Sequence, residues 1–343
     1  MMRSFTALAA GLRQLFRTEA GRIICIVTLF SVAAASTGCS RGYISAYSDN
    51  LSRSSCSMTA VSADFSGFTS LYAEDLAVPG EGGKAEAGDV FAAGLFDLQD
   101  GKTVVEENLT KRLYPASITK IMTALLAVKY GDMDEMLTAS ARVPEMEWEA
   151  QKIGIEKGDR MTMEQALNYL LVYSANDAAV LIAENIGKDY DDFIRMMNEE
   201  AARIGATNTH FVNPHGLHDP DHYTTAYDLY LIFRECLKYP EFRKLMHQDY
   251  YSTIFHDKDG NMRAIEVPST DFYLLGTASA PAGISVAGGK TGTTDQAGNC
   301  LIILSENSDG REFISVILGA KGYDELYVCM NRLLRLERGY AGQ

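Results

Sequence analysis

Three short clusters of side chains in this sequence could together perform covalent chemistry on an acyl group. In the first, Ser117 and Lys120 lie three residues apart where a helix is expected to begin, so the lysine amine shares a helix face with the serine hydroxyl. A hydroxyl beside an amine base is the arrangement of a nucleophile activated for attack on a carbonyl carbon. The start of a helix also directs backbone N–H groups and a positive dipole towards the surroundings of that serine.

The second and third clusters combine hydroxyl, amide and amine groups: Ser174 and Asn176, then Lys290, Thr291 and Gly292. Each is weak evidence alone, because a Ser-x-x-Lys arises by chance in a chain of this size and Ser-x-Asn also occurs at 48–50 and 305–307. The structural alternatives are helix capping or turn chemistry for the serines and a glycine-rich strand edge for the third cluster. In this order along one chain, the three clusters are far more specific than any one of them.

Hydrophobic periodicity predicts the elements that would position these clusters. The expected helices span residues 118–131, 163–170, 178–187, 190–205 and 323–338. The expected strands span residues 90–98, 103–105, 284–293, 299–305 and 313–319. Asp100-Gly101 is a hairpin turn between the first two strands, and Thr162-x-x-Gln165 is a capping box. A strand pair, a helical middle and a closing strand meander predict an α/β (α+β) fold with its sheet completed by both chain ends.

Longer stretches around the three clusters resemble the low-molecular-mass penicillin-binding proteins, and among them the serine-type D-Ala-D-Ala carboxypeptidases. The stretches are RLYPASITKIMTA at 112–124, YSANDAA at 173–179 and FVNPHGLHDPDHYTTAYD at 211–228. The resemblance covers about residues 89–338. It implies the β-lactamase/transpeptidase-like fold, in which an antiparallel sheet formed by both chain ends is flanked by helices and accompanied by a helical subdomain.

The resemblance implies a substrate, a peptidoglycan stem peptide ending in D-Ala-D-Ala, and a role for each candidate residue. Ser117 would attack the carbonyl between the two D-alanines, giving an acyl-enzyme that water hydrolyses. Lys120 would accept the serine proton, provided that burial and a second cation, Lys290, hold the amine neutral. Ser174 would relay the proton to the leaving amine, and Asn176 would hold a peptide group of the substrate.

The remaining implied roles belong to the third cluster and to the adjacent backbone. Lys290 and Thr291 would bind the terminal carboxylate, and Gly292 would leave room for the substrate along its strand. The backbone N–H groups of Ser117 and Thr293 would form the oxyanion hole. β-Lactam antibiotics would acylate the same serine. We expect no cofactor and no metal.

Other interpretations compete with the carboxypeptidase. A serine β-lactamase shares the three motifs, but its deacylating glutamate motif should follow the Ser-x-Asn element, and Glu164 precedes it here. A nucleotide-binding P-loop ending at Lys290 would need glycine in place of Ile284 and a following helix. Four histidines between 210 and 222 could suggest a zinc hydrolase. However, residues 213–216 (Asn-Pro-His-Gly) have the composition of a turn, and the family has this turn without a metal. A non-catalytic cell-wall-binding module is the alternative from another functional class.

The first 88 residues have the composition of an export signal and a tether. Arginines precede an apolar run at 23–35 that is too short to span a bilayer well, which predicts a signal peptide over 1–38, or else an uncleaved anchor. Cleavage at the alanines 33–35 competes with lipidation of Cys39 in an imperfect lipobox. The Ser-, Thr- and Gly-rich stretch 39–88 predicts a tether, and 89–343 then forms one catalytic domain.

This organisation predicts an exported protein at the outer face of the cytoplasmic membrane or in the cell wall. Because the chain ends soon after the last expected helix, we expect any membrane attachment to come through the N-terminus. The net charge of −14 argues against a nucleic-acid partner, which would require a basic surface. Outside the signal and Cys39, four cysteines remain: Cys56, Cys236, Cys300 and Cys329. Three pairings of them, or buried free thiols, are all compatible with the sequence.

Overall fold

An antiparallel sheet of five strands forms the main layer of the protein. The computed structural model describes residues 79–80, 82–83, 88, 90–147 and 150–342. The expected signal peptide, Cys39, Cys56 and most of the expected tether lie outside the described residues.

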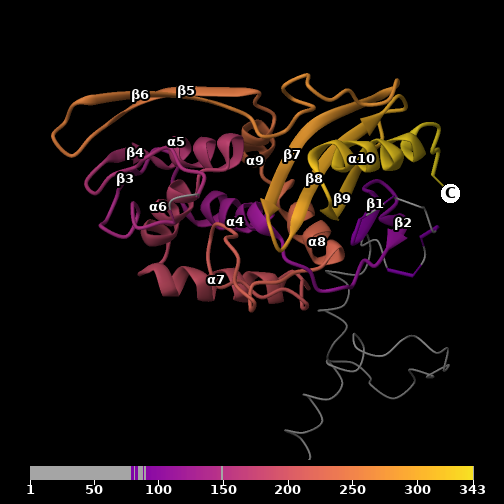
Figure 1. Cartoon of the computed structure of the whole chain (residues 1–343), viewed down its shortest axis with the longest axis horizontal. Coiled ribbons are helices and arrows are strands. Elements are labelled where there is room, and N and C mark those ends of the chain that lie inside the picture. The colour runs from indigo at the N-terminus through magenta and orange to yellow at the C-terminus, as the bar shows by residue number, and fades with distance from the viewer. Residues whose placement is uncertain (1–78, 81, 84–87, 89, 148–149, 343) are drawn as a thin grey trace, which may run out of the picture. The chain divides into compact units, whose positions relative to one another are not determined.

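The strands of this sheet come from the two ends of the described chain (Figure 1). They are β1 (Ala92–Asp97), β2 (Lys102–Glu107), β7 (Ile284–Thr294), β8 (Gly298–Asn307) and β9 (Glu312–Ala320), in the order β2-β1-β9-β8-β7. Pairing of β1 with β9, which sets Ala93 opposite Ile317, joins the N-terminal hairpin to the C-terminal meander. The expectation of a sheet completed by both chain ends is therefore confirmed, and β7, which carries the third cluster, is an edge strand.

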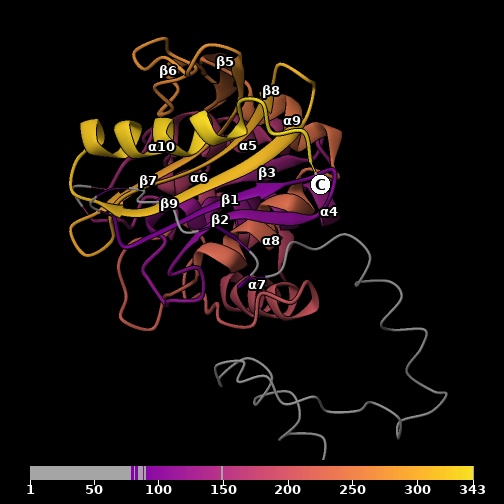
Figure 2. The same cartoon turned by 90° about the vertical axis from the view of Figure 1, so that its right-hand side faces the viewer.

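Helices cover both faces of the main sheet (Figure 2). Helix α10 (Tyr323–Glu337) packs on β8 and β9, while α8 (Ala226–Cys236) packs on β1 and β9. Along β9 successive side chains alternate between the two hydrophobic cores, with Phe313 in the core under α10 and Ile314 in the other. Because both faces are buried, the strand reads as a continuous apolar run rather than as an alternating one.

The helical part is built around α4 (Lys120–Tyr130), which is buried from Lys120 to Ala127. Around it lie the other helices of this part: α5 (Met163–Asn168), α6 (Asn176–Ile186), α7 (Tyr190–Arg203) and α9 (Pro240–Met246). The predicted capping box is confirmed, because Thr162 Oγ1 accepts the Gln165 N–H and the Gln165 side chain accepts the Thr162 N–H. Beyond α5 the helix widens into a π-helical turn, η2 (Tyr169–Tyr173), a type of turn that is frequent at functional sites.

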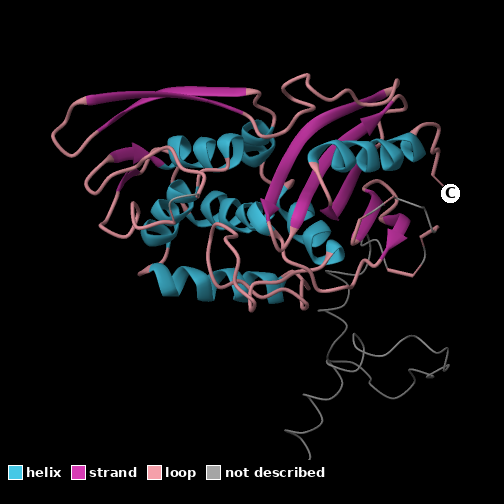
Figure 3. Cartoon of the chain, viewed as in Figure 1, coloured by secondary structure: helices cyan, strands magenta, loops and turns pink. Residues whose placement is uncertain are grey.

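The sequence analysis did not identify the second sheet, nor α8 and α9. This sheet has the order β3-β4-β5-β6, with β3 (Met136–Thr138), β4 (Arg160–Thr162), β5 (Tyr250–His256) and β6 (Met262–Pro268). Two of the strands are only three residues long, and β5 and β6 form the long hairpin at the upper left of Figure 3.

The structure describes three of the cysteines and the helices whose length and apolar character can be compared with those of a membrane-spanning segment. Cys236 and Cys300 are buried free thiols, and Cys329 is also buried. Of the alternatives for the cysteines, buried free thiols are therefore confirmed for Cys236 and Cys300. Within the described residues, no helix combines the length and the apolar character needed to cross a membrane.

Candidate active site

The first cluster lies on a tight turn that leads into the central helix. The 3-10 helix η1 (Ala116–Thr119) runs directly into α4, and Lys120 is the first residue of α4. The Lys120 Nζ atom lies 2.8 Å from Ser117 Oγ, so the predicted contact between residues three apart is present. Ala116, just before the serine, has a φ of 49°, a left-handed conformation that costs on the order of 1–3 kcal/mol in a non-glycine residue.

A chain of hydrogen bonds from the segment 212–222 holds this strained turn. Thr119 Oγ1 donates to the carbonyl of Ala116 (2.8 Å), and His222 Nε2 lies 2.7 Å from the same threonine oxygen. The Val212 N–H donates to His222 Nδ1 (3.2 Å), which leaves Nε2 as the protonated nitrogen that donates to Thr119. A Cβ on Gly216 would lie 1.9 Å from the Ala116 carbonyl oxygen, so only glycine allows the segment to approach this closely.

The amine of Lys120 is fully buried among oxygen acceptors. Besides Ser117, it contacts Asn176 Oδ1 (2.7 Å) and the carbonyl oxygen of His215 (2.7 Å). Burial, together with the positive charge of Lys290, lowers the pKa of Lys120 well below its usual value, and Asp177 opposes this shift. A neutral amine has two N–H donors and one lone pair. The two donors match the amide and carbonyl oxygens, and the lone pair is left for the hydroxyl proton of Ser117.

The second cluster lies at the junction between η2 and α6. Ser174 ends the π-helical turn in the left-handed conformation (φ 66°), and its buried Oγ has no hydrogen-bond partner among the described residues. Asn176 begins α6, and its amide oxygen receives the Lys120 amine. The first and second clusters, 56 residues apart in sequence, therefore meet around one amine.

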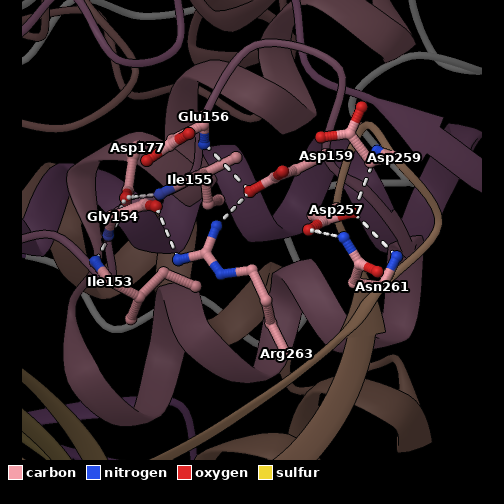
Figure 4. A network of polar contacts seen from close by, with 10 residues as sticks. All are labelled: Ile153, Gly154, Ile155, Glu156, Asp159, Asp177, Asp257, Asp259, Asn261 and Arg263. Atoms are coloured by element: carbon pink, nitrogen blue, oxygen red, sulfur yellow. Dashed lines mark hydrogen bonds and ion pairs between the residues drawn. The ribbon is translucent and has the colours of Figure 1, made fainter.

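A polar network fixes the backbone beside the second cluster (Figure 4). The buried carboxylate of Asp177 accepts the N–H groups of Ile153 (3.3 Å), Gly154 (2.8 Å) and Ile155 (3.0 Å). From strand β6, Arg263 donates to the carbonyl of Gly154 (3.0 Å) and forms an ion pair with Asp159. The start of α6, the loop before β4 and the β5–β6 hairpin are thus held as one unit.

The third cluster lies on edge strand β7, directly against residues 115–118. These residues carry Ser117, the candidate nucleophile, and are called the nucleophile turn. Lys290 is buried, its Nζ donates to the Thr291 carbonyl (2.9 Å), and burial lowers its pKa to about 7 against the opposing effect of Asp271. Thr291 Oγ1 donates to Thr270 Oγ1 (2.6 Å), and the exposed Thr293 lies one residue beyond Gly292.

Gly292 is the point at which the strand and the turn touch. A Cβ there would lie 2.9 Å from the Pro115 carbonyl oxygen and 2.9 Å from the backbone nitrogen of Ser117. The sequence analysis explained Gly292 by room for a substrate. The structure adds that close contact of two backbones requires glycine at this position.

The comparisons with known proteins agree with this geometry. Residues 84–322 match the model of the D-alanyl-D-alanine carboxypeptidase family. The chain belongs to this family. It is 32% identical over 254 residues to the D-alanyl-D-alanine carboxypeptidase DacF of Bacillus subtilis, an alignment that covers 71% of this chain and 60% of the relative. The chain thus spans about 60% of the length of the first curated relatives that it matches.

Solved structures confirm the predicted fold. Penicillin-binding protein 5 from Haemophilus influenzae is 28% identical with a TM-score of 0.64, covering 72% of this chain and 70% of that one. The Streptomyces K15 DD-transpeptidase is 23% identical with a TM-score of 0.67, covering 72% of this chain and 96% of that one, and at this identity it supports the fold alone.

The structure also bears on the competing interpretations. Lys290 lies in the middle of strand β7, which continues to Thr294 and turns into β8, so the helix that a P-loop requires is absent at this point. Glu164 forms a surface ion pair with Lys244 (3.1 Å). His215 and His222 are buried, and each accepts a hydrogen bond from a backbone N–H group. Burial lowers the pKa of His215 to about 3 and that of His222 to about 4. The described residues hold no cluster of three or more metal-ligating side chains.

Sequence reasoning missed the residues that hold the three clusters in place from a distance. They are Thr119, Asp177, Gly216, His222 and Thr270. Four of them fall within the three stretches that carry the family resemblance, which was the only available signal. Their contacts lie between residues as far as 103 positions apart, beyond the range of any local pattern.

Proposed function

We propose that this protein is a serine D,D-carboxypeptidase that removes the terminal D-Ala from peptidoglycan stem peptides, and that β-lactams acylate the same serine. The observation that carries the proposal is the buried Lys120 amine, 2.8 Å from Ser117 Oγ and held by two further oxygen acceptors. An amine with a depressed pKa in this position is a general base ready to accept the serine proton at neutral pH. Membership of the family supports the choice of substrate.

Acylation uses the first and third clusters together. Ser117 Oγ transfers its proton to the Lys120 lone pair and attacks the carbonyl carbon between the two D-alanines, forming a tetrahedral oxyanion. The backbone N–H groups of Ser117 and Thr293 stabilise that oxyanion, and each such donor contributes about 3–4 kcal/mol in comparable enzymes. Lys290 and Thr291 hold the terminal carboxylate, whose negative charge favours the protonated form of Lys290.

Collapse of the intermediate uses the second cluster. The C–N bond breaks, and the proton taken up by Lys120 passes through the Ser174 hydroxyl to the leaving D-Ala amine. The unpartnered Oγ of Ser174 supports this role, since a buried hydroxyl without a partner is otherwise costly. The Asn176 amide oxygen is engaged by Lys120, which leaves its amide nitrogen to donate to a substrate peptide carbonyl. Water activated by Lys120 then hydrolyses the acyl-enzyme.

We further propose the domain arrangement predicted from the sequence: a signal peptide or anchor over 1–38, a tether over 39–88 and a catalytic domain over 89–343. The protein would be exported, and its attachment to the membrane would come through the N-terminus, with lipid on Cys39 if the lipobox is used. The intact mass of the exported protein distinguishes cleavage, lipidation and retention of the signal.

The catalytic proposal is tested by covalent labelling with a fluorescent penicillin together with D-Ala release from an acyl-D-Ala-D-Ala peptide. Ser117→Ala should lose both, whereas the matched control Ser285→Ala, an exposed serine at the opposite end of β7, should keep both. Labelling of Ser117→Ala would remove the nucleophile assignment. Rapid nitrocefin hydrolysis without D-Ala release would favour a β-lactamase, and loss of activity in EDTA would favour a metal hydrolase.

A further inference from the structure

A cavity of about 450 Å³ lies beside the nucleophile turn and has no role in the steps above. Its lining includes Phe91, Arg112, Tyr114, Tyr223, Gln296 and Ala297. The lining residues come from four segments: residue 91 just before β1, residues 112–114 just before Ser117, residues 220–223 before α8, and residues 296–297 in the turn between β7 and β8.

The position of the cavity follows from the contact between Gly292 and the nucleophile turn. Gly292 lies against Pro115 and Ser117. From this contact, the segment before Pro115 reaches the cavity at Tyr114, and the segment after Gly292 reaches it at Gln296. The cavity therefore lies beyond Gly292 on the side of Thr294, away from Lys290.

This position places the cavity where the upstream part of a peptide substrate would run. If Lys290 and Thr291 hold the terminal carboxylate and Ser117 meets the next carbonyl, the rest of the peptide continues along edge strand β7 towards its C-terminal end. An extended chain advances about 3.3 Å per residue. The residue that precedes the two D-alanines then lies level with positions 294–296, at the mouth of the cavity.

The chemistry of the lining selects what this residue could carry. Three aromatic rings form apolar walls, and Arg112 is the only charged residue in the lining. Its guanidinium lies 4.7 Å from the ring centre of Tyr223 and donates one N–H to Asn208 Oδ1 (3.2 Å). Among the described residues Arg112 forms no ion pair, so several of its donors remain available to a ligand carboxylate.

We propose that this cavity is the subsite for the side chain of the residue preceding D-Ala-D-Ala, and that Arg112 selects a side chain with a methylene stem ending in a carboxylate. The inference rests on the proposed function, which fixes the direction of the peptide. The stem packs on the aromatic walls, and the carboxylate pairs with the guanidinium. A side chain ending in an ammonium group fits the walls equally well but is repelled by Arg112.

The test compares three acyl-X-D-Ala-D-Ala peptides in which X is L-2-aminoadipate, L-norleucine or L-lysine. We expect kcat/KM for D-Ala release to fall in that order, with aminoadipate favoured over lysine by about tenfold or more. In Arg112→Gln the ratio between aminoadipate and lysine should fall towards one, and Arg112→Lys should retain part of the preference because it keeps the charge.

A matched control separates the subsite from a general effect of losing a surface arginine. Arg142 also stacks on a tyrosine, 4.4 Å from the ring centre of Tyr190, but lines a different cavity beside Glu184. Arg142→Gln should preserve the preference of the wild type.

Each outcome decides one of the two proposals. A wild-type ratio of one or less, or a ratio that Arg112→Gln leaves unchanged, would overturn the subsite. If Arg112→Gln does not fold, the wild-type ranking and Arg112→Lys still decide the matter. Should the wild type release D-Ala from none of the three peptides and remain unlabelled by penicillin, the carboxypeptidase itself would fail. Equal release from all three would reject only the subsite.

Discussion

The active-site edge of the main sheet and the core under α10 both bury an ionisable group, with different consequences. At the edge, the amine of Lys120 touches a serine hydroxyl, beside a strained residue and a glycine contact between two backbones. Under α10, the buried carboxyl of Glu337 accepts hydrogen bonds from Ser305 Oγ (2.8 Å) and Ser315 Oγ (3.2 Å), and burial raises its pKa to about 8.

The comparison shows that a perturbed pKa alone does not identify a catalytic group. Structural groups in a core undergo the same desolvation as catalytic groups do. What distinguishes Lys120 is a reactive partner within hydrogen-bond distance and a backbone held in an unfavourable conformation. The two serines that bond to Glu337 are completely buried beside the hydrophobic core under α10, whereas Ser117 is partly exposed and accessible to a substrate.

The largest effect should come from removing the base. We expect Lys120→Met to slow acylation by penicillin about a thousandfold, in the range of a lost general base. In the wild type, kcat/KM for acylation should fall as the pH drops through the depressed pKa of Lys120, because the protonated amine cannot accept the serine proton. Lys129→Met, at the other end of α4, is the control and should acylate normally. If Lys120→Met acylates within about tenfold of the wild type, Lys120 is not the base.

The next effect should come from separating the strand and the turn. Gly292→Ala inserts a Cβ 2.9 Å from both the Pro115 carbonyl oxygen and the Ser117 nitrogen, so the turn must shift. A small displacement of reacting groups costs about a hundredfold, and we expect a loss of that size in acylation rate. Gly322→Ala is the matched control, because its Cβ meets nothing and its φ is −166°. Equal acylation rates in the two variants would contradict the close-contact argument.

A smaller effect should follow from loosening the strained residue. His222→Phe removes the donor to Thr119 and leaves the Val212 N–H without its acceptor, and we expect acylation to slow about tenfold. Because burial lowers the pKa of His222 to about 4, protonation below that value breaks the Val212 contact in the wild type. The wild type should therefore lose acylation below about pH 4 beyond the loss due to Lys120, and the variant should not show this extra loss. The exposed His256 provides the control, His256→Phe.

The smallest effect on acylation should come from the core under α10, where Glu337→Gln should leave the rate within about twofold and alter stability instead. The folded-state pKa of Glu337 is raised above the usual 4.5, so the native protein binds the proton more tightly and loses stability as the pH rises from about 4.5 to 8. At pH 8 this amounts to about 4 kcal/mol as an upper value. Thermal unfolding should show the variant stabilised at about pH 8 and close to the wild type at about pH 4.5. An unchanged difference between the two conditions would contradict a buried, titrating Glu337.

Much of this protein followed from local sequence patterns. The capping box at Thr162 and the strand with Lys290 could be predicted because each depends on residues close together in sequence. The sheet completed by both chain ends could be predicted from the order of the elements and from the family resemblance. Helix and strand periodicity identified the strands under α10 and, around α4, the helices α5, α6 and α7, but not α8 and α9. In the second sheet, β3 and β4 escaped prediction because strands of three residues are too short to show a period. The strands β5 and β6 bury only one residue each, so their apolar pattern is weak.

Only the tertiary structure could decide how the clusters meet. Asn176 and Lys120 are 56 residues apart, and His222 and Thr119 are 103 apart. Hydrogen bonds of this range, and the exclusion of a Cβ at Gly292 and Gly216, depend on the packing of whole elements against one another. The sequence by itself determined which groups could react. Packing determined which of them are buried, which backbone is strained, and therefore which amine is positioned to accept a proton.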